Sequence, residues 1–236
     1  MIMIELKNIS TIAPADFSKK NTKKETKKAA QKIGELSRIY EADKSHSLLV
    51  VFQGMDTSGK DGATRETFKY VSPNIVCATS FKKPTDLEMS HDFLWRVHKE
   101  VPPKGKIKVF NRSHYEDILI QRVHNWIDDE MVEKRMKSIN DFEELLKYDN
   151  NTTILKFYLH ISREKQKEKL QERIDVDRKN WKHNPGDWKE AELWDEYMKA
   201  YEYAINNSVI PWIIIPADQR WYRNHIVAKT VLEALE

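Results

Sequence analysis

Residues 54–62, GMDTSGKDG, place three glycines around a single lysine directly after an apolar run. The spacing G-x-x-x-x-G-K is typical of a phosphate-binding loop, whose backbone N–H groups and following helix N-terminus hold phosphate oxygens. Glycine is needed where φ is positive or a phosphate approaches the backbone. An ordinary strand-to-helix turn is the alternative. The residues that we expect to bind phosphate or nucleotide here are Gly54, Met55, Thr57, Ser58, Gly59, Lys60, Asp61 and Gly62.

Two carboxylates within this loop are unexpected in a site for anions. Asp61 stands where such loops usually carry the Ser or Thr that ligates Mg²⁺. Stabilisation by the helix dipole is the simpler explanation for Asp61. Asp56, at the crown of the loop, is better placed to hold a hard cation directly or through water, with a turn-stabilising cap as the alternative. We therefore expect Mg²⁺ to bridge Asp56 to phosphates.

A second group of candidates follows another apolar run, in IKVFNRSHYEDILIQRV at residues 107–123. The carboxyl ends of parallel strands line one crevice, so Arg112 and Asp117 are expected to face the same site as Lys60. Arginine can clamp phosphate with two hydrogen bonds, and a carboxylate can hold Mg²⁺ or its waters. A surface ion pair is the alternative. Glu116 also fits a capping box with Ser113.

The elements that position these residues are predicted by alternating strand and helix patterns. Strands are predicted at 47–53, 75–81, 106–110, 152–162 and 209–215. Helices are predicted at 60–70, 86–100, 114–147, 163–180, 187–207 and 218–235. Alternation of this kind indicates βαβ units, and near-continuous apolar strands indicate a parallel sheet buried on both faces. We expect a three-layer α/β/α fold with about five strands in one domain over residues 1–236.

Two basic segments frame this domain. A helical extension at about 15–45 carries seven lysines between Lys19 and Lys32, which form either a solvated face or an electrostatic guide for an anionic substrate. The segment at about 163–195 contains Arg173, Arg178, Lys179 and Lys182 and is interrupted at Pro185-Gly186, with Asp187 and Glu190 spaced as a restart cap. A basic lid that closes on phosphates is one interpretation, and a solvated charged helix is the other.

Composition limits the class of protein. The 236 residues carry 40 Lys and Arg against 37 Asp and Glu, so the net charge of +3 demands no polyanionic partner. Cys77 stands alone, which excludes an internal disulfide and suits a reducing compartment. No apolar run approaches the ~20 residues that span a bilayer, and MIMIELKNIS lacks a signal-peptide pattern. We expect a cytoplasmic protein that binds neither membrane nor nucleic acid.

Five sequence blocks together resemble the polyphosphate kinase 2 family: GMDTSGKDG, SFKKPTDLEMSHDFLWRVHKEVP, FNRSHYEDILIQRV, RKNWKHNPGDWKEAELWDEYMKAYE and PWIIIPADQRWYRN. They occur in the family's order over about residues 47–225. The resemblance implies a P-loop kinase fold with a helical lid and phosphoryl transfer between inorganic polyphosphate and purine nucleotides. It also implies Mg²⁺, with Mn²⁺ as a substitute, and a homodimer or homotetramer.

The resemblance further implies roles for individual residues. Those implied to be catalytic are Asp56, Lys60, Arg112, Asp117 and Arg178, of which Asp56 and Asp117 are implied to hold the metal. Further contacts to phosphate or nucleotide are expected from Lys82, Asn111, Glu116, Arg122 and Lys179.

The second block departs from DRSWYNR, which some family members carry: this chain has NRSHYED. The chain resembles the subgroup called class III, whose members accept nucleoside monophosphates as well as diphosphates. The expected reactions therefore convert AMP and ADP, or GMP and GDP, into ADP and ATP, or GDP and GTP. Alternatives are a thymidylate-kinase-like nucleoside monophosphate kinase that uses ATP, and a non-enzymatic regulator that binds polyphosphate or nucleotide.

Overall fold

The computed structural model describes residues 3–236 and contains one sheet of five parallel strands in the order β2-β3-β1-β4-β5. The strands are β1 (Ser47–Gln53), β2 (Val76–Ser80), β3 (Ile107–Asn111), β4 (Thr152–His160) and β5 (Trp212–Pro216). The predicted parallel α/β fold is thus confirmed, with strand ends shifted by a few residues. All seven residues of the central strand β1 are buried, as the apolar sequence of a doubly covered strand requires.

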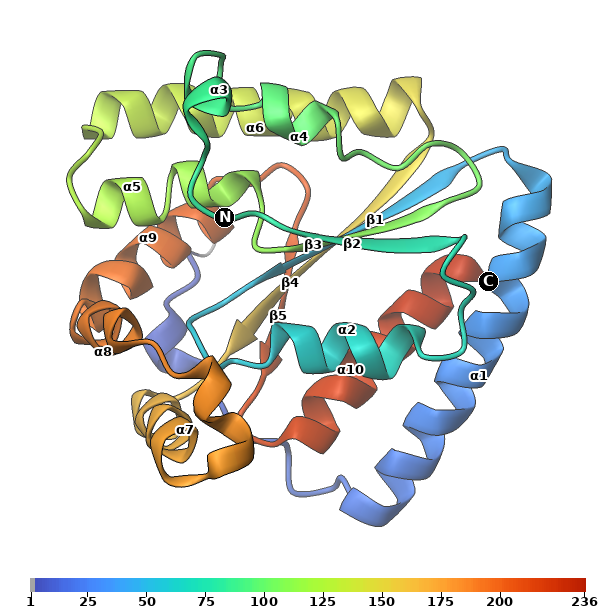
Figure 1. Cartoon of the computed structure of the whole chain (residues 1–236). Coiled ribbons are helices and arrows are strands. Elements are labelled where there is room, and N and C mark those ends of the chain that lie inside the picture. The colour runs from blue at the N-terminus through green and yellow to red at the C-terminus, as the bar shows by residue number, and fades with distance from the viewer. Residues whose placement is uncertain (1–2) are drawn as a thin grey trace.

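Helices cover both faces of the sheet (Figure 1). One layer contains α1 (Lys19–Asp43), α2 (Lys60–Phe68) and α10 (Arg220–Leu235). The other contains α3 (Asp86–Met89), α4 (Trp95–His98), α5 (Ile120–Val123) and α6 (Asp129–Asp149). Helix α9 (Trp194–Asn206) packs beside α5. Within the described part of the chain, no helix is both long enough and apolar enough to cross a bilayer.

The predicted continuous helix at 114–147 is wrong. The chain forms a 3-10 helix, η2 (His114–Asp117), then α5, and then α6. Asn125 ends α5 with a φ of 54°, in the left-handed region that asparagine tolerates. Asp128 then caps α6 by accepting the Met131 N–H at 2.8 Å. The predicted helix at 86–100 is likewise divided into α3 and α4.

The capping predictions have mixed outcomes. Thr85 and Glu88 form the capping box that starts α3. The box proposed for Ser113 and Glu116 is wrong. Ser113 Oγ accepts the N–H of Tyr115 instead, and the carboxylate of Glu116 lies near the guanidinium of Arg112. The restart cap at Asp187 is also wrong: Asn184 caps the helix by accepting the Gly186 N–H, with Pro185 in the first turn.

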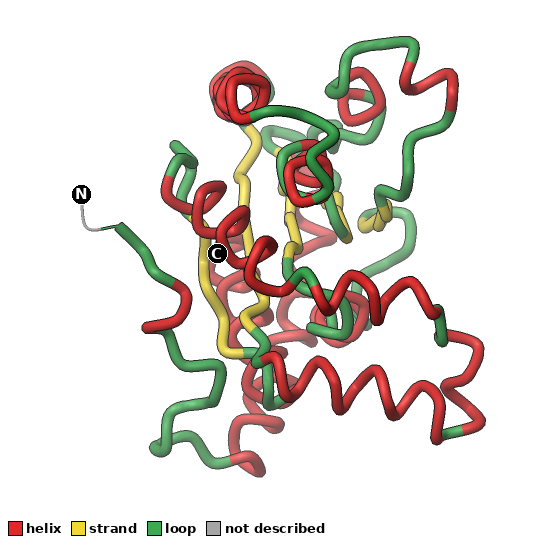
Figure 2. Tube along the Cα trace, turned by 90° about the vertical axis from the view of Figure 1, so that its left-hand side faces the viewer, coloured by secondary structure: helices red, strands yellow, loops and turns green. Residues whose placement is uncertain are grey.

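Two helices extend from the sheet as a hairpin. They are α7 (Arg163–Asp175) and α8 (Pro185–Glu192), joined by the 3-10 helix η3 (Asp177–Lys182). We call residues 163–192 the α7–α8 module. In Figure 2 this module projects away from the yellow strands. Helix α7 contacts both η3 and α8. The predicted interruption at Pro185-Gly186 is present, since η3 ends at Lys182 and α8 begins at Pro185. Across this break, Arg173 of α7 pairs with Asp187 of α8.

Four fully buried polar side chains contact one another at η2, and we call them the interior cluster. It consists of His114, Tyr115, Glu143 and Lys156, and each is at most 1% exposed. Lys156 Nζ donates to Glu143 Oε2 and to Tyr115 Oη, both at 2.6 Å. His114 Nε2 lies 3.2 Å from Glu143 Oε1. The cluster links β4, α6 and η2, and thereby fixes the segment that follows β3.

Candidate active site

The loop between β1 and α2 has the backbone shape of a phosphate cradle. Gly54 and Gly59 have φ values of 145° and 96°, which residues with a Cβ atom rarely adopt. A Cβ at Gly54 would lie 2.7 Å from Leu159 O, and one at Gly59 would lie 1.9 Å from Arg223 Nη1. Thr57, a non-glycine at φ 68°, marks a strained turn of the kind that clusters at functional sites.

Lys60 begins α2 and directs its side chain back over the loop. Its Nζ donates to Gly54 O at 2.7 Å and to Met55 O at 3.2 Å. Burial and the neighbouring Arg112 lower the pKa of Lys60 to about 8, against the opposite influence of Asp56. The ammonium therefore has carbonyl partners but lies in a poorly hydrated place, where a phosphate oxygen would favour the charged form.

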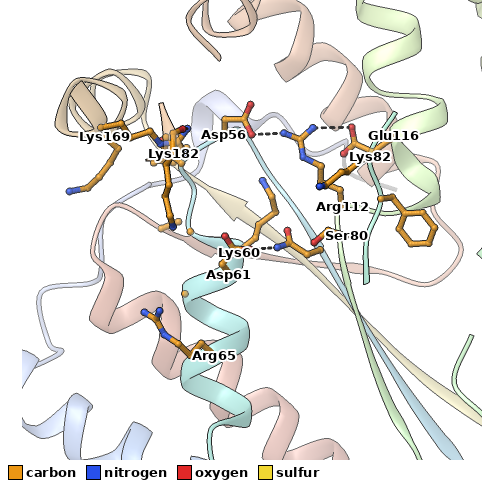
Figure 3. Close-up of a pocket in the computed structure, with 18 of the residues that line it drawn as sticks. Asp56, Lys60, Asp61, Arg65, Ser80, Lys82, Arg112, Glu116, Lys169 and Lys182 are labelled. Atoms are coloured by element: carbon orange, nitrogen blue, oxygen red, sulfur yellow. Dashed lines mark hydrogen bonds and ion pairs between the residues drawn. The ribbon is translucent and has the colours of Figure 1, made fainter. Parts of the chain in front are cut away.

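Arg112 lies opposite Lys60, and Figure 3 shows its guanidinium between two carboxylates. Arg112 Nη2 pairs with Asp56 Oδ1, and Nη1 lies 3.6 Å from Glu116 Oε2. The backbone of Arg112 has a φ of 60°, unusual for a residue with a side chain, and its N–H donates to Phe52 O at 3.1 Å. The backbone after β3 thus holds Arg112 and Glu116 so that both side chains face the space above the phosphate loop.

The two carboxylates beside Arg112 differ in their protonation behaviour. Burial would raise the pKa of Asp56, but Arg112 and Lys60 outweigh it and lower that pKa. Burial raises the pKa of Glu116 even though Arg112 and Lys60 act against the shift. Asp56 is therefore the carboxylate kept ionised at the loop.

Asp117 lies at the same edge but is already engaged. Gln121 Nε2 donates to Asp117 Oδ1 at 2.6 Å, and Arg96 Nη2 lies 3.5 Å from Oδ2. The side chain is buried, and burial raises its pKa despite the opposing effect of Arg96 and Arg135. Both oxygens of Asp117 thus have protein partners in this structure.

The first turn of α10 supplies a buried cation behind the loop. Arg223 is 4% exposed and donates to Ser58 O at 2.8 Å and to Asn224 Oδ1 at 2.9 Å. Burial, together with Arg220, lowers the pKa of Arg223 to about 10. Among residues 3–236, no carboxylate forms an ion pair with Arg223, so its charge lies against the phosphate loop without a counterion.

The α7–α8 module presents basic side chains from the other side. Glu172 accepts from Lys169 at 2.7 Å and from Lys179 at 2.5 Å, and these hydrogen bonds lower the pKa of Glu172 to about 2. Arg178 is exposed at the pocket and has no acidic partner within 4 Å in the described chain. The module is joined to the body where Glu190 bonds His124 at 3.0 Å and Tyr197 at 2.6 Å.

These groups meet in one cavity of about 1090 Å³. It lies at the carboxyl ends of the strands, and each of the five strands is followed closely by a residue of its lining. From β1 to β5 these residues are Asp56, Lys82, Arg112, Ile161 and Ala217. Its lining holds twice as many basic as acidic side chains. A cavity of this composition favours an anionic ligand with several phosphates.

Most of the predicted site residues line this cavity. Those on the lining are Asp56, Thr57, Gly59, Lys60, Asp61, Gly62, Lys82, Asn111, Arg112, Glu116, Asp117, Arg178 and Lys179. Gly54, Met55 and Ser58 form the back of the loop, with carbonyls directed to Lys60 and Arg223. Asp61 accepts the side-chain amide of Asn111.

Arg122 is the predicted site residue that the structure places elsewhere. It does not line the cavity. The turn after α5 brings Asp129, the first residue of α6, beside Arg122, and the two pair at 2.7 Å. Arg122 also lies 4.7 Å from the ring centre of Tyr203. Its expected contact with phosphate has no support in this geometry.

Sequence reasoning did not assign several residues of the lining, among them Arg65, Arg96, Trp126, Arg220 and Arg223. A signal existed for the last two, because PWIIIPADQRWYRN places both arginines at the start of the helix that follows the fifth strand. Trp126 is 65% exposed and stacks on His124 at 4.9 Å. Its position depends on the left-handed Asn125, which no spacing in the sequence indicates.

The fold and the site together define a P-loop kinase: a parallel sheet with a phosphate loop after its central strand and cations converging on that loop. A family model described as polyphosphate kinase 2 (PPK2) matches residues 16–236. The chain therefore belongs to the polyphosphate kinase 2 family.

Similar proteins agree with this membership. The AMP/ADP-polyphosphate phosphotransferase of Meiothermus ruber is 46% identical over 209 residues, which cover 87% of this chain and 78% of that protein. The ADP-polyphosphate phosphotransferase of Rhodopseudomonas palustris is 37% identical, with 87% and 76% covered. The crystal structure of polyphosphate kinase 2 from Arthrobacter aurescens TC1 superposes with a TM-score of 0.94 at 38% identity, covering 98% of this chain and 85% of that one.

Proposed function

We propose that this chain transfers the terminal phosphoryl group between inorganic polyphosphate and purine nucleoside mono- and diphosphates. The observation that carries the proposal is the cationic cavity around the loop of residues 54–62, in a chain of the polyphosphate kinase 2 family. Relatives named for AMP and ADP support both acceptors. The ATP-dependent monophosphate kinase considered from the sequence gains no support from these relatives.

Each residue has a role that follows from its position. The backbone of the loop and Lys60 bind the phosphates that flank the reacting group, since Lys60 Nζ needs only to exchange carbonyl partners for phosphate oxygens. Arg112 stabilises charge on the transferred group from the β3 side. Arg178 does so from the α7–α8 module, which we propose acts as a lid that closes over the cavity and excludes water. Positioning and electrostatics suffice, so no covalent intermediate is required.

Mg²⁺ is the proposed cofactor, with Mn²⁺ as a substitute, and Asp56 and Asp117 are the carboxylates proposed to hold it. Asp56 fits well, because it is kept ionised at the loop. Asp117 fits only if Mg²⁺ or its waters replace Gln121 or Arg96 as partners. Mg²⁺ commonly takes one or two carboxylates and completes its shell with water and phosphate oxygens. When bound, it would neutralise charge shared by donor and acceptor.

The remaining parts of the proposal concern the setting of the reaction. We propose that the protein is cytoplasmic, as we expect from its composition. We also propose that it acts as a homodimer or homotetramer, as the family resemblance implies. Glu116, which faces Arg112 in the cavity, is proposed to influence the choice between mono- and diphosphate acceptors.

The test supplies purified protein with Mg²⁺ and polyphosphate as the sole phosphate source, and with AMP, ADP, GMP or GDP in separate reactions. We expect ADP, ATP, GDP and GTP respectively, and loss of each product on chelation of the metal. Asp56→Asn should fold normally and lose most of the activity. Phosphorylation of AMP from ATP, with none from polyphosphate, would instead identify the ATP-dependent alternative.

A further inference from the structure

Six lysines on α1 form a charged stripe outside the cavity. They are Lys19, Lys20, Lys23, Lys24, Lys27 and Lys28, and we call them the lysine stripe. All six are exposed, and in residues 3–236 none of them lies within 4 Å of a carboxylate; the next lysine, Lys32, pairs with Glu35 at 3.2 Å. Their period of four residues is close to the helical repeat of about 3.6, so they follow one side of α1 over roughly 13 Å.

The charges of the lysine stripe oppose the stability of the helix that carries it. Lysines at positions i and i+4 repel each other across each turn. The first turn of α1 contains Lys19 and Lys20 and no acidic residue, although the positive end of the helix dipole favours acidic side chains there. An arrangement that is unfavourable for the isolated helix is explained if an anion binds along it.

The lysine stripe lies on the side of α1 that turns toward α2. At about 100° per residue, Gly34 falls on the same side of α1 as the stripe, whereas Glu25 falls on the opposite side. Gly34 contacts Tyr70, just beyond the end of α2, while Glu25 lies 3.8 Å from His225 of α10. Helix α2 runs from the cavity toward α1 (Figure 1), so the stripe and the cavity share one flank of the molecule.

The first turn of α10 connects the cavity to the start of α1. Arg220 and Arg223 line the cavity, and the ring of Tyr222 between them contacts Phe17, 4.9 Å away, just before α1 begins. Arg65 of α2 also lines the cavity and is exposed. Basic side chains therefore continue from the phosphate loop over α10 and α2 to the lysine stripe.

We propose that the lysine stripe binds the distal part of a long polyphosphate chain whose reacting end lies at Lys60. This inference rests on the proposed function and adds to it a determinant of chain length. A long chain occupies both the cavity and the stripe, whereas an oligophosphate of a few residues ends within the cavity. The stripe lies outside the reacting centre, so it contributes to the affinity for long chains and leaves the turnover number unchanged.

The test compares two variants that lose the same charge. The first carries Lys19→Gln, Lys20→Gln, Lys23→Gln and Lys24→Gln, which remove exposed charges at little cost in helix propensity. The control carries Lys104→Gln, Lys134→Gln, Lys137→Gln and Lys147→Gln, whose lysines are exposed and lie outside the cavity, three of them on α6 across the sheet. Kinetics are measured with a polyphosphate of about a hundred phosphates and with hexaphosphate, at several salt concentrations.

We expect the first variant to raise KM for the long polyphosphate about tenfold or more, with kcat unchanged and with KM for hexaphosphate unchanged. Its affinity for the long chain should also depend less steeply on salt, as expected when fewer counterions are released. The control variant should behave like the natural protein with both substrates.

The inference would be overturned if the first variant and the natural protein had equal KM values for the long chain. It would also be overturned if KM rose by the same factor with both chain lengths. Binding of duplex DNA is measured as well. If the natural protein binds DNA as tightly as polyphosphate and the first variant does not bind DNA, the stripe is a general surface for polyanions and the inference is overturned. Failure of the natural protein to use either chain length would refute the proposed function itself, which is a distinct result.

Discussion

The interior cluster and the cavity differ in how their buried cations are paired, although the two regions share one segment of chain. His114 and Tyr115 point into the interior cluster, whereas Arg112 and Glu116, on either side of them, face the cavity. In the interior cluster, Lys156 and Glu143 are fully buried and each has its partners within the protein. In the cavity, Arg223 is nearly as buried but has no carboxylate partner in the described chain, and the pKa of Lys60 is lowered.

The difference separates a structural role from a binding role. A buried charge that is fully paired contributes to one specific packing arrangement and has nothing to offer a ligand. A buried charge that lacks a counterion costs stability until an anion arrives, and the anion then gains the interaction. Lys60 and Arg223, which form no ion pair in the described chain, thus distinguish the cavity from the interior cluster, although Arg112 in the cavity is paired with Asp56.

The largest expected effect is the loss of catalysis in the cavity without loss of folding. Lys60→Ala should lower kcat with polyphosphate by about 10²–10³-fold, the usual loss when one preorganised donor to a charged transition state is removed. Its free energy of unfolding should stay equal or increase, because a desolvated ammonium is removed. Steady-state kinetics and denaturant titration test both statements, with Lys137→Ala as the control. A folded Lys60→Ala protein with full activity would end the assignment.

The interior cluster should respond in the reverse manner. Lys156→Met leaves the buried Glu143 without its cation, and we expect the free energy of unfolding to fall by about 3–5 kcal/mol. At temperatures where the variant is still folded, KM should change little. Replacing Glu143 by Gln in the same chain should recover part of the stability, because the unpaired charge is removed as well. Comparable stability of the natural protein and Lys156→Met would remove the contrast between the regions.

Arg223 gives a sharper test. It is buried like the residues of the interior cluster, but it lines the cavity and forms no ion pair with a carboxylate in the described chain. Arg223→Gln should lower kcat/KM for polyphosphate by roughly 10–100-fold, the equivalent of one charge-assisted hydrogen bond. Its stability should change far less than that of Lys156→Met. Arg38→Gln, an exposed substitution on α1, serves as the control. A large loss of stability with normal kcat/KM would place Arg223 with the interior cluster.

The smallest expected effect is a pH dependence with opposite signs for activity and stability. Because the pKa of Lys60 is about 8, kcat/KM for polyphosphate should fall above pH 8 by at most tenfold per unit as the ammonium is lost. Between about pH 8 and 10.5, the unfolded chain holds the Lys60 proton more tightly than the folded protein. Stability therefore rises with pH there, by at most about 1.4 kcal/mol per unit.

This rise is measured as a difference from Lys60→Met, which should lack it while other titrating groups cancel. Parallel stability curves for the two proteins across pH 8–10.5 would show that Lys60 keeps an ordinary pKa in the folded state.

Much of the fold could be predicted because its signals are local. The apolar runs of the strands and the glycine spacing at residues 54–62 lie within short windows, and the parallel sheet and the family were both confirmed. The breaks within 114–147 could not be predicted, because they depend on Asn125 adopting a left-handed conformation between two amphipathic stretches. Helical periodicity continues across such a break and gives no warning of it.

The site could be predicted where a residue follows a strand directly. Asp56, Lys82 and Arg112 meet at the sheet edge for that reason. Arg122 lies off the cavity lining and pairs with Asp129, which the turn after α5 brings beside it. Its contact with phosphate stays a prediction. Asp117 has one partner, Gln121, four residues along the chain. Its other partner, Arg96, comes from α4, and a contact between separate elements leaves no trace in one sequence. The assigned roles in binding and catalysis stay predictions.

The contact between Gly59 and Arg223 has a consequence for how this protein can change. A methyl group at position 59 and a guanidinium at position 223 would occupy the same space, with only 1.9 Å between their atoms. A shorter residue at 223 would remove this contact, but the φ of 96° at position 59 would still disfavour every residue with a Cβ atom. In a library that randomises both positions, we therefore expect active chains to keep glycine at 59 whatever residue stands at 223.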